Sequence, residues 1–470
     1  MRKGVTVSLE LPSIAELPAG LEPAGVHVMH LIGCALNGRV ARPLPEGTTW
    51  EQVHALAKRN SVEAMVFLGA QSCADIPVDL RKQWEDETQM TLYRRLQFDA
   101  AREQVFAAMD EVGLSYLPMK GTILAPLYPS PEMRSMADND FLYGFVGPCS
   151  DGVGFELQGS GAGEAERAKT VEAGVRALER VMRGLGYETV SLRRGNHDVY
   201  HKRPLLNFEP HRRLVAPDSP VAVYYENPWK RAIRDDANSH EFHFGDEDAY
   251  IYLIVHAHKH FSNSGCGVRY VVDIWVFLRA RGARMDGEYV RAQLDELGLS
   301  EFERASRQLA EHLFGSVGRL GGKGLDGDVV AAIRGVDAGE AARASGADAA
   351  DAAGACGSEA EEALDEGDRS LLRYLLFAGT YGNLAQHMEH EIADLAAEHD
   401  GDLRAAKRAY LVGRINSHKA VESLFPRASK IKVLYPFLQV ARLVSKAVTN
   451  PRKAINELRI LRRRRGSGEK

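Results

Sequence analysis

Two aspartates one residue apart, Asp138 and Asp140, are the side chains of this 470-residue protein whose type and spacing most directly suggest chemistry. If residues 138–143 form a β-strand, residues i and i+2 point to the same face, with Cα atoms about 6–7 Å apart. Two carboxylates at that separation can share a hard divalent cation, and Mg²⁺ or Mn²⁺ is the expected cofactor. The same spacing also occurs in solvated turns, so the metal interpretation needs support from the rest of the chain.

A turn upstream of the aspartates could bind phosphate. Lys120, Gly121 and Thr122 follow a short apolar strand predicted over residues 114–118, and such a turn is expected to leave backbone N–H groups free for a phosphate. Arg134 lies four positions before Asp138, from where it could reach the same phosphate. Metal-bound carboxylates and phosphate contacts are the parts that an attack on the α-phosphate of a nucleotide requires. The stretch therefore predicts nucleotidyl transfer, provided that a third carboxylate lies beside the pair.

Glu209 is our candidate for the third carboxylate, and Asp198 is the alternative. Glu209 ends a strand predicted over residues 205–209, after a helix and a hairpin that could return the chain to the aspartates. Pro210 follows it and cannot donate a hydrogen bond to a sheet, so we expect this strand to lie at a sheet edge or to end there.

Five segments together resemble the uncharacterised nucleotidyltransferase family of the DNA polymerase beta-like superfamily. They are KGTILAPLYPSPEMRSMADND (120–140), GNHDVYHKRPLLNFEPHRRL (195–214), EDAYIYLIVHAHKHFSNSGCGVRYVVDIWVFL (247–278), FAGTYGN (377–383) and YPFL (435–438), so the resemblance covers roughly residues 26–445. It implies a mixed sheet flanked by helices, metal roles for Asp138, Asp140 and Glu209, and phosphate contacts from Lys120–Thr122. The chain departs from the wider superfamily in having Thr122 in place of the usual serine, and Asn139 where an apolar residue is commoner.

The fold class that we expect is α+β, with a small nucleotidyltransferase-type sheet between largely helical N- and C-terminal regions. Residues 331–368 are rich in Ala, Gly and acidic residues and contain too few large apolar side chains to order themselves. The predicted organisation is a poorly ordered arm (1–25), a helical region (26–113), a nucleotidyltransferase core (114–216) with a flexible insertion (144–163), a second helical region (217–330), the low-complexity insertion (331–368), a C-terminal helical region (369–450) and a basic tail (451–470).

Composition limits the classes of function. The hydrophobic fraction of 45% and charged fraction of 26% are ordinary for a globular protein, and the net charge of −5 gives no reason to expect nucleic-acid binding. The five cysteines are dispersed without a CxxC pair, which favours a reducing compartment over a disulfide framework or structural zinc. No signal peptide is visible after Met1. We therefore expect a cytoplasmic protein.

A helix predicted over residues 246–261 offers other polar groups. His256 and His260 are spaced i, i+4, as zinc ligands often are, and Asp273 follows on the next predicted helix. Position 257 is alanine, where a metalloprotease would need a glutamate, so we favour hydrogen-bonded structural histidines. Arg269 and Asp273 could form a helix-surface pair. Alternatively, Lys259 or Arg269 could face a cleft and bind nucleotide phosphates.

The C-terminal stretch 430–465 is basic and amphipathic, so it could lie on an anionic membrane surface or dock on the protein itself. The function that we expect is Mg²⁺-dependent transfer of a nucleoside monophosphate from an NTP to an unknown acceptor, which could be a small hydroxylated molecule, a sugar or a protein hydroxyl. Glu209 would be the general base. The alternatives are an inactive nucleotide-binding or interaction protein on the same fold, and a peripheral membrane-associated protein.

Overall fold

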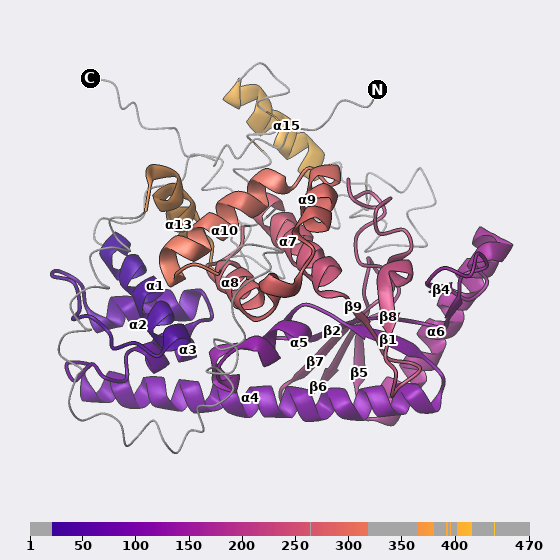
Figure 1. The fold of residues 1–470 in the computed structure, drawn as a ribbon, viewed down its shortest axis with the longest axis horizontal. Coiled ribbons are helices and arrows are strands. Elements are labelled where there is room, and N and C mark those ends of the chain that lie inside the picture. Colours follow the sequence, from indigo (N-terminus) through magenta and orange to yellow (C-terminus); the bar gives the residue numbers. More distant parts are fainter. Residues whose placement is uncertain are drawn as a thin grey trace.

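The computed structural model describes residues 21–263, 265–317, 364–379 and 402–415, together with the single residues 392, 395 and 437. A β-sheet lies on one long helix, α4, and a block of helices lies on the opposite side of the sheet (Figure 1). This mixed arrangement confirms the predicted α+β class.

The N-terminal helices are α1 (Leu21–Asn37), α2 (Trp50–Arg59), α3 (Glu63–Gly69) and α4 (Val78–Glu111). Thr49 caps α2, in a reciprocal capping box with Gln52. The 34 residues of α4 span about 51 Å, so one helix runs beneath both α1–α3 and the sheet (Figure 1). It begins at Val78, directly after Pro77.

The main sheet has the strand order β1-β2-β7-β6-β5. Its strands are β1 (Ser115–Pro118), β2 (Asn139–Gly144), β5 (Glu188–Ser191), β6 (Val199–Lys202) and β7 (Leu206–His211), and only the β2–β7 pair is parallel. Between β1 and β2 lie α5 (Gly121–Leu124), η1 (Ala125–Leu127) and η2 (Pro131–Met133), and α6 (Glu164–Gly184) precedes β5. Alternate residues Phe141, Tyr143 and Phe208 pack in one core cluster with residues of α4 and α6.

Pro210 does not place its strand at an edge, because β7 is the central strand of the sheet. The other possibility, that the strand ends near Pro210, is correct, since β7 ends one residue later at His211. The regular β6–β7 register reaches the Tyr200–Phe208 pair, and the same pairing continues just before β6, where the Asp198 N–H donates to the Pro210 carbonyl at 2.9 Å and His197 bridges His211. Because proline has no N–H, Pro210 cannot return this hydrogen bond to Asp198, and the ladder lacks one bond at this pair.

Two regions contain strands that the sequence did not predict. The expected flexible insertion at 144–163 holds a hairpin, β3 (Val146–Pro148) and β4 (Phe155–Leu157), followed by η3 (Ser160–Ala162). The start of the region expected to be helical from 217 holds η4 (Pro228–Arg231) and a second hairpin, β8 (Ala232–Arg234) and β9 (Phe242–Phe244). The rings of Phe155 and Phe242 pack 5.0 Å apart, so apolar side chains anchor the two hairpins to each other.

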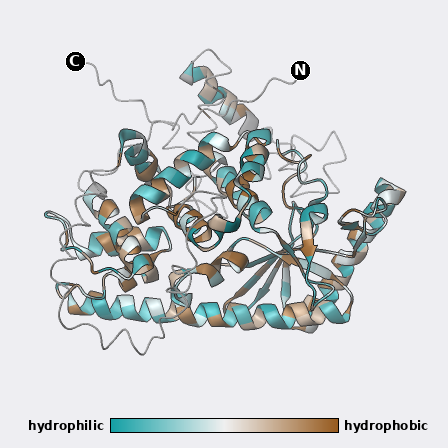
Figure 2. Ribbon diagram, in the orientation of Figure 1, coloured by the Kyte–Doolittle hydropathy of each residue, from teal (hydrophilic) through white to brown (hydrophobic). Residues whose placement is uncertain are grey.

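The helices on the other side of the sheet are α7 (Asp246–Asn263), α8 (Arg269–Arg281), η5 (Gly282–Arg284), α9 (Gly287–Glu296), α10 (Ser300–Phe314), α13 (Glu366–Ala378) and α15 (Leu403–Ile415). Hydrophobic residues are frequent where α5, α7 and α8 face one another (Figure 2). Apolar residues of α7 and α8 share one core cluster with those of α1–α3. No helix in the described ranges combines the length and hydropathy that a membrane span needs.

Several predicted segments lie outside the described residues. They are the arm up to residue 20, the low-complexity insertion up to residue 363, most of the C-terminal helical region, and the basic stretch 430–465 apart from Phe437. Two predicted boundaries differ from the structure. Residues 21–25 of the expected arm are helical, and Leu364 of the expected low-complexity insertion is buried just before α13.

Candidate functional site

Three carboxylates meet on one face of the sheet. In the parallel β2–β7 pair, Asp140 lies directly opposite Glu209, and neighbouring residues at such a position point to the same face. Asp138 stands two residues before Asp140, just ahead of β2. All three line a cavity of about 340 Å³ between the sheet, α5, α7 and α8. The fold thus brings together the three carboxylates proposed from the sequence.

Asn139 points to the opposite face, where the superfamily usually has an apolar residue. Its side-chain amide donates to the carbonyl oxygen of Phe98 in α4 at 3.1 Å, and Arg102 of the same helix donates to its Oδ1 at 3.4 Å. Asn139 is fully buried. Both the amide N–H and the amide oxygen of Asn139 therefore have partners on α4. A polar residue at this position thus leaves Asp138 and Asp140 on the cavity side of the sheet.

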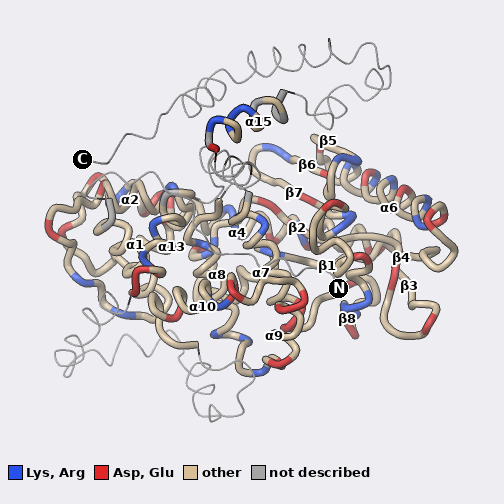
Figure 3. Tube along the Cα trace, turned by 90° about the horizontal axis from the view of Figure 1, so that it is seen from above, with Lys and Arg blue, Asp and Glu red and all other residues tan. Residues whose placement is uncertain are grey.

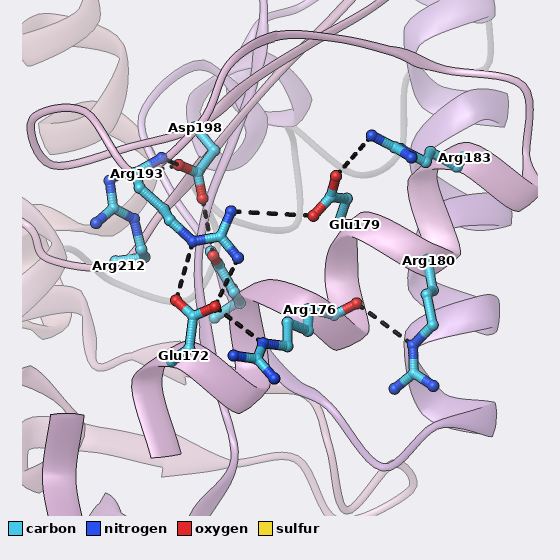
Figure 4. A network of polar contacts seen from close by, with 9 residues as sticks. Glu172, Arg176, Glu179, Arg180, Arg183, Arg193, Asp198 and Arg212 are labelled. Atoms are coloured by element: carbon cyan, nitrogen blue, oxygen red, sulfur yellow. Dashed lines mark hydrogen bonds and ion pairs between the residues drawn. The ribbon is translucent and has the colours of Figure 1, made fainter. Parts of the chain in front are cut away.

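Asp198, the alternative third carboxylate, has a structural role instead. It is fully buried and accepts hydrogen bonds from the Arg193 backbone N–H at 2.6 Å and from the Tyr143 hydroxyl at 3.0 Å. Arg212 lies 3.4 Å from its Oδ1. Figure 4 shows Asp198 within a network of charged groups that continues along α6, where acidic and basic residues are interspersed (Figure 3). Because Tyr143 packs on the α6 face of the sheet, Asp198 is directed away from Asp140, and this alternative was wrong.

Lys120 neutralises one of the aspartates. Its Nζ lies 2.7 Å from Asp140 Oδ1, and His211 Nε2 lies 2.8 Å from the same oxygen. Although burial acts to raise the pKa of Asp140, these two neighbours hold it well below its ordinary value. Lys120 adopts φ +52° and ψ −123°, a conformation that costs a residue with a Cβ about 1–3 kcal/mol. The fold thus keeps a strained backbone at the residue whose ammonium group reaches Asp140.

Asp138 and Glu209 retain an excess of negative charge. Burial, Asp140 and Glu209 raise the pKa of Asp138 from 3.8 to about 7, and burial and Asp140 also raise the pKa of Glu209. No hydrogen bond or ion pair from a described residue reaches the Asp138 carboxylate, and Glu209 Oε2 has His197 Nε2 at 3.5 Å. Carboxylates with raised pKa values and unused oxygens form a donor set that suits a divalent cation such as Mg²⁺ or Mn²⁺.

Sequence reasoning missed two histidines beside this set. His197 and His211 form an antiparallel bridge, and together with Glu209 they offer three ligand atoms within 4.8 Å of one another. His211 stands two residues after Glu209, so the rule that places Asp138 and Asp140 on one face could have identified it. The position of His197 depends on the pairing of distant strands, so no spacing in the sequence could have indicated that it lies beside Glu209.

The turn at Lys120–Thr122 offers fewer free amides than expected. Thr122 N–H donates to the Met119 carbonyl at 3.1 Å, and the amides of Ile123 and Leu124 donate to the Lys120 carbonyl at 3.2 and 3.1 Å. The Gly121 amide has no acceptor among the described residues. The Thr122 hydroxyl is buried and also has no partner there. One amide and one hydroxyl, rather than a run of amides, are thus the donors that the turn leaves unused.

Arg134 lines the cavity, but its guanidinium is held by Asp273 of α8. Its Nε and Nη2 donate to the two carboxylate oxygens at 2.7 and 3.1 Å, and the Tyr128 hydroxyl donates to Asp273 Oδ1 at 2.7 Å. Asp273 is buried and is bound by Arg134, so it does not lie on the helix surface where a pair with Arg269 was considered. Arg134 connects α8 to the loop that leads to Asp138.

Helix α7 completes the wall of the cavity with Tyr252, His256 and His260. The rings of His256 and His260 lie 4.6 Å apart. Burial and the neighbouring lysines Lys259 and Lys120 lower the pKa of His260 to about 4, so this imidazole is neutral at pH 7. Burial and Lys120 also lower the pKa of Lys259, whereas Asp140 and Glu209 raise it. The sequence alternative named Lys259 or Arg269 as a cation facing a cleft, and of these two Arg269 is among the residues that line the cavity.

Of the comparisons with known proteins, the family match identifies the family of this chain. A search of curated proteins found no match. Among solved structures, an antigenic nucleotidyltransferase-like protein from Paracoccidioides brasiliensis is similar to this chain at 14% sequence identity. The alignment covers 47% of this chain and 93% of that protein, and its TM-score of 0.28 is too low to carry a structural argument. The family described as "Uncharacterised nucleotidyltransferase" matches residues 46–144 and 171–315, just over half of the chain, and the unmatched stretch between them contains the β3–β4 hairpin. The chain belongs to this uncharacterised nucleotidyltransferase family.

Proposed function

We propose that this protein transfers a nucleoside monophosphate from an NTP to an acceptor hydroxyl, with Mg²⁺ or Mn²⁺ held by Asp138, Asp140 and Glu209. The observation that carries the proposal is the register of the parallel strands, which sets Glu209 opposite Asp140 on the cavity face. Family membership supports the reaction class.

The side chains have distinct roles in this proposal. A bound divalent cation would supply charge stabilisation at the α-phosphate and at the attacking and leaving oxygens. Asp138, just ahead of β2, and Asp140 in β2 would hold it together with Glu209 of β7, and Glu209 would accept the proton of the acceptor hydroxyl. The raised pKa of Glu209 favours this role as a base. The ammonium group of Lys120 exchanges its contact with Asp140 for the phosphate oxygens of the nucleotide.

Arg134 has a positioning role rather than the direct phosphate contact that the sequence suggested. Its hydrogen bonds to Asp273 account for Nε and Nη2, and Nη1 donates to the Ser135 carbonyl at 2.9 Å. The side chain therefore holds the loop before Asp138 against α8. Gly121, with its unused amide, and Thr122, with its unused hydroxyl, remain the proposed phosphate donors of the turn.

The acceptor is a small hydroxylated molecule, a sugar or a protein hydroxyl, and the net charge of −5 does not favour a nucleic acid. We place the protein in the cytoplasm, in accordance with the four described cysteines, which form no disulfide. Attachment to a membrane surface would involve the basic stretch 430–465, which lies outside the described part of the chain except for Phe437.

One observation favours a second candidate function, nucleotide binding without catalysis. Lys120 and His211 both contact Asp140 Oδ1, and this oxygen is one of those that a metal ion would need. If the lysine kept this contact in the presence of nucleotide, the protein would bind an NTP without transferring it. Transfer of label from the NTP separates the two functions.

Calorimetric titration of the protein with ATP, with and without Mg²⁺, tests the metal–nucleotide site. We expect Mg²⁺-dependent binding that is lost in Asp138→Asn/Asp140→Asn and kept in Glu188→Gln, an exposed acidic residue on β5 of the same sheet. Incubation of α-labelled NTPs with small-molecule and protein fractions then identifies the acceptor. Metal-independent binding that survives the double substitution would contradict the proposed site.

A further inference from the structure

A second, larger cavity of about 610 Å³ lies beside the catalytic one. It is enclosed by β4, η3, the first turn of α6, the residues after β7, and residues 223–231. The two cavities have no lining residue in common, but they share an aromatic wall. Tyr225 lines the second cavity, Tyr252 lines the catalytic cavity, and their rings pack edge to face at 5.7 Å. A ligand in one cavity is thus one layer of side chains away from the other.

The second cavity has two cations fixed at its inner end. Arg212 is 16% exposed and is held by Asp198 and by the carbonyl oxygens of Arg194 and Gly195. Arg231 is 28% exposed, lies 4.1 Å from the ring of Tyr224, and donates to Tyr289 Oη and Gln293 Oε1 at 2.8 and 3.1 Å. These contacts orient both guanidinium groups before any ligand arrives.

Three further cations, at the exposed mouth, are held more weakly, although Arg167 Nη2 also donates to the Glu226 carbonyl oxygen at 3.0 Å. Arg167 lies 4.0 Å from Glu226, whose side chain is 74% exposed, and Lys230 lies 3.1 Å from Asp151, with about half of each side chain exposed. Such solvent-exposed pairs contribute little to stability, so a ligand can displace them at small cost. Arg213 is exposed, and no side-chain hydrogen bond or ion pair joins it to another described residue.

Two buried polar groups of the cavity lining have no partner. Neither the Tyr225 hydroxyl nor Arg212 Nε has a hydrogen-bond partner among the described residues. Burial raises the pKa of Tyr225 well above its ordinary value, so its hydroxyl keeps its proton. An unpartnered buried donor costs about 1–3 kcal/mol, and a ligand acceptor that reached either group would recover part of that cost.

We propose that this cavity binds a small molecule that carries phosphate groups, independently of the nucleotide in the catalytic cavity. Arginine forks match phosphate oxygens in geometry, and the lining contains five cations against the acidic residues Glu156 and Glu226. The volume exceeds that of a phosphate ion and leaves room for an organic group of the size of a sugar. The chemistry of the lining selects the charge of the ligand and leaves the organic group undefined.

Calorimetry with inorganic tripolyphosphate in EDTA tests this site without metal-dependent binding to the carboxylates. We expect saturable binding, tighter than that of inorganic phosphate, that weakens at least tenfold in Arg213→Ala/Lys230→Ala. It should weaken severalfold in Tyr225→Phe, because a site that only attracts charge would not depend on a hydroxyl. Asp151→Asn should strengthen binding, since it releases Lys230.

Two controls separate this site from others. Lys120→Ala, in the catalytic cavity, should leave tripolyphosphate binding unchanged, and so should Arg291→Ala/Arg304→Ala, which removes two exposed arginines on α9 and α10. The altered mouth residues are themselves exposed, so we expect those variants to keep the wild-type melting temperature. Absence of binding, or binding that is lost in Lys120→Ala but kept in Arg213→Ala/Lys230→Ala, would overturn the proposal.

Discussion

Replacement of Asp273 by alanine should destabilise the protein strongly, because it leaves the charge of Arg134 buried and without its counter-ion. The two side chains are only 7% and 8% exposed. Asp273 accepts two hydrogen bonds from Arg134 and one from the Tyr128 hydroxyl. Removal of one partner of such a buried pair costs about 3–5 kcal/mol. We therefore expect a loss of this size in the free energy of unfolding.

Urea denaturation followed by tryptophan fluorescence measures this effect, since Trp275 stands two residues from Asp273 on α8. Glu166→Ala is the matched control, because it breaks an exposed ion pair with Lys169 and should cost less than about 1 kcal/mol. The double variant Arg134→Met/Asp273→Leu should recover much of the loss, since it removes both buried charges. A cost below about 1 kcal/mol for Asp273→Ala would refute the view that this pair fastens the loop before Asp138 to α8.

Three further predictions concern the catalytic cavity. The pKa of Asp138 is raised from 3.8 to about 7, so the metal-free protein loses stability as the pH rises through this range and the carboxylate becomes charged. A bound cation should restore that stability, and Mg²⁺ should therefore raise the melting temperature more at pH 8 than at pH 6. The difference should be absent in Asp138→Asn. Lys120→Gly should be about 1 kcal/mol more stable than Lys120→Ala in urea denaturation, since glycine adopts φ +52° without strain. Equal stabilities of the two variants would show that the backbone is not strained at this residue. His197→Ala should weaken Mn²⁺ binding more than Mg²⁺ binding in equilibrium dialysis, because imidazole is a better ligand for Mn²⁺ than for Mg²⁺. Equal losses of affinity for the two ions would exclude His197 as a ligand.

The elements around the carboxylates could be predicted because their signals are local. The strand expected over 138–143 is β2 at Asn139–Gly144, and that expected over 205–209 is β7 at Leu206–His211. In β7, Leu206, Phe208 and Pro210 alternate with polar residues, which is the pattern of a strand with two different faces. β2 instead continues from Asp140 into the apolar run Phe141–Tyr143 and is buried throughout. The i, i+2 rule then placed Asp138 and Asp140 together without knowledge of the fold.

The remaining features depend on contacts between distant residues. β3, β4, β8 and β9 have three residues each, too few to show a period, so their hairpins were missed. Arg134 and Asp273 are 139 residues apart, and the sequence does not show that one holds the other. The sequence favoured Glu209 and left Asp198 open as the alternative, and only the strand pairing directs Glu209 to Asp140 and Asp198 to Tyr143.

The central claim is that the carboxylate site transfers the nucleotidyl group, and the position of the transferred label tests it most directly. The protein should be incubated with Mg²⁺, a cell fraction that contains the acceptor, and ATP labelled at either the α- or the γ-phosphate. The α-label should appear on the acceptor with release of pyrophosphate, and Glu209→Gln should abolish both while Glu188→Gln retains them. Transfer of the γ-label, or α-label transfer that survives Glu209→Gln, would contradict the proposed mechanism.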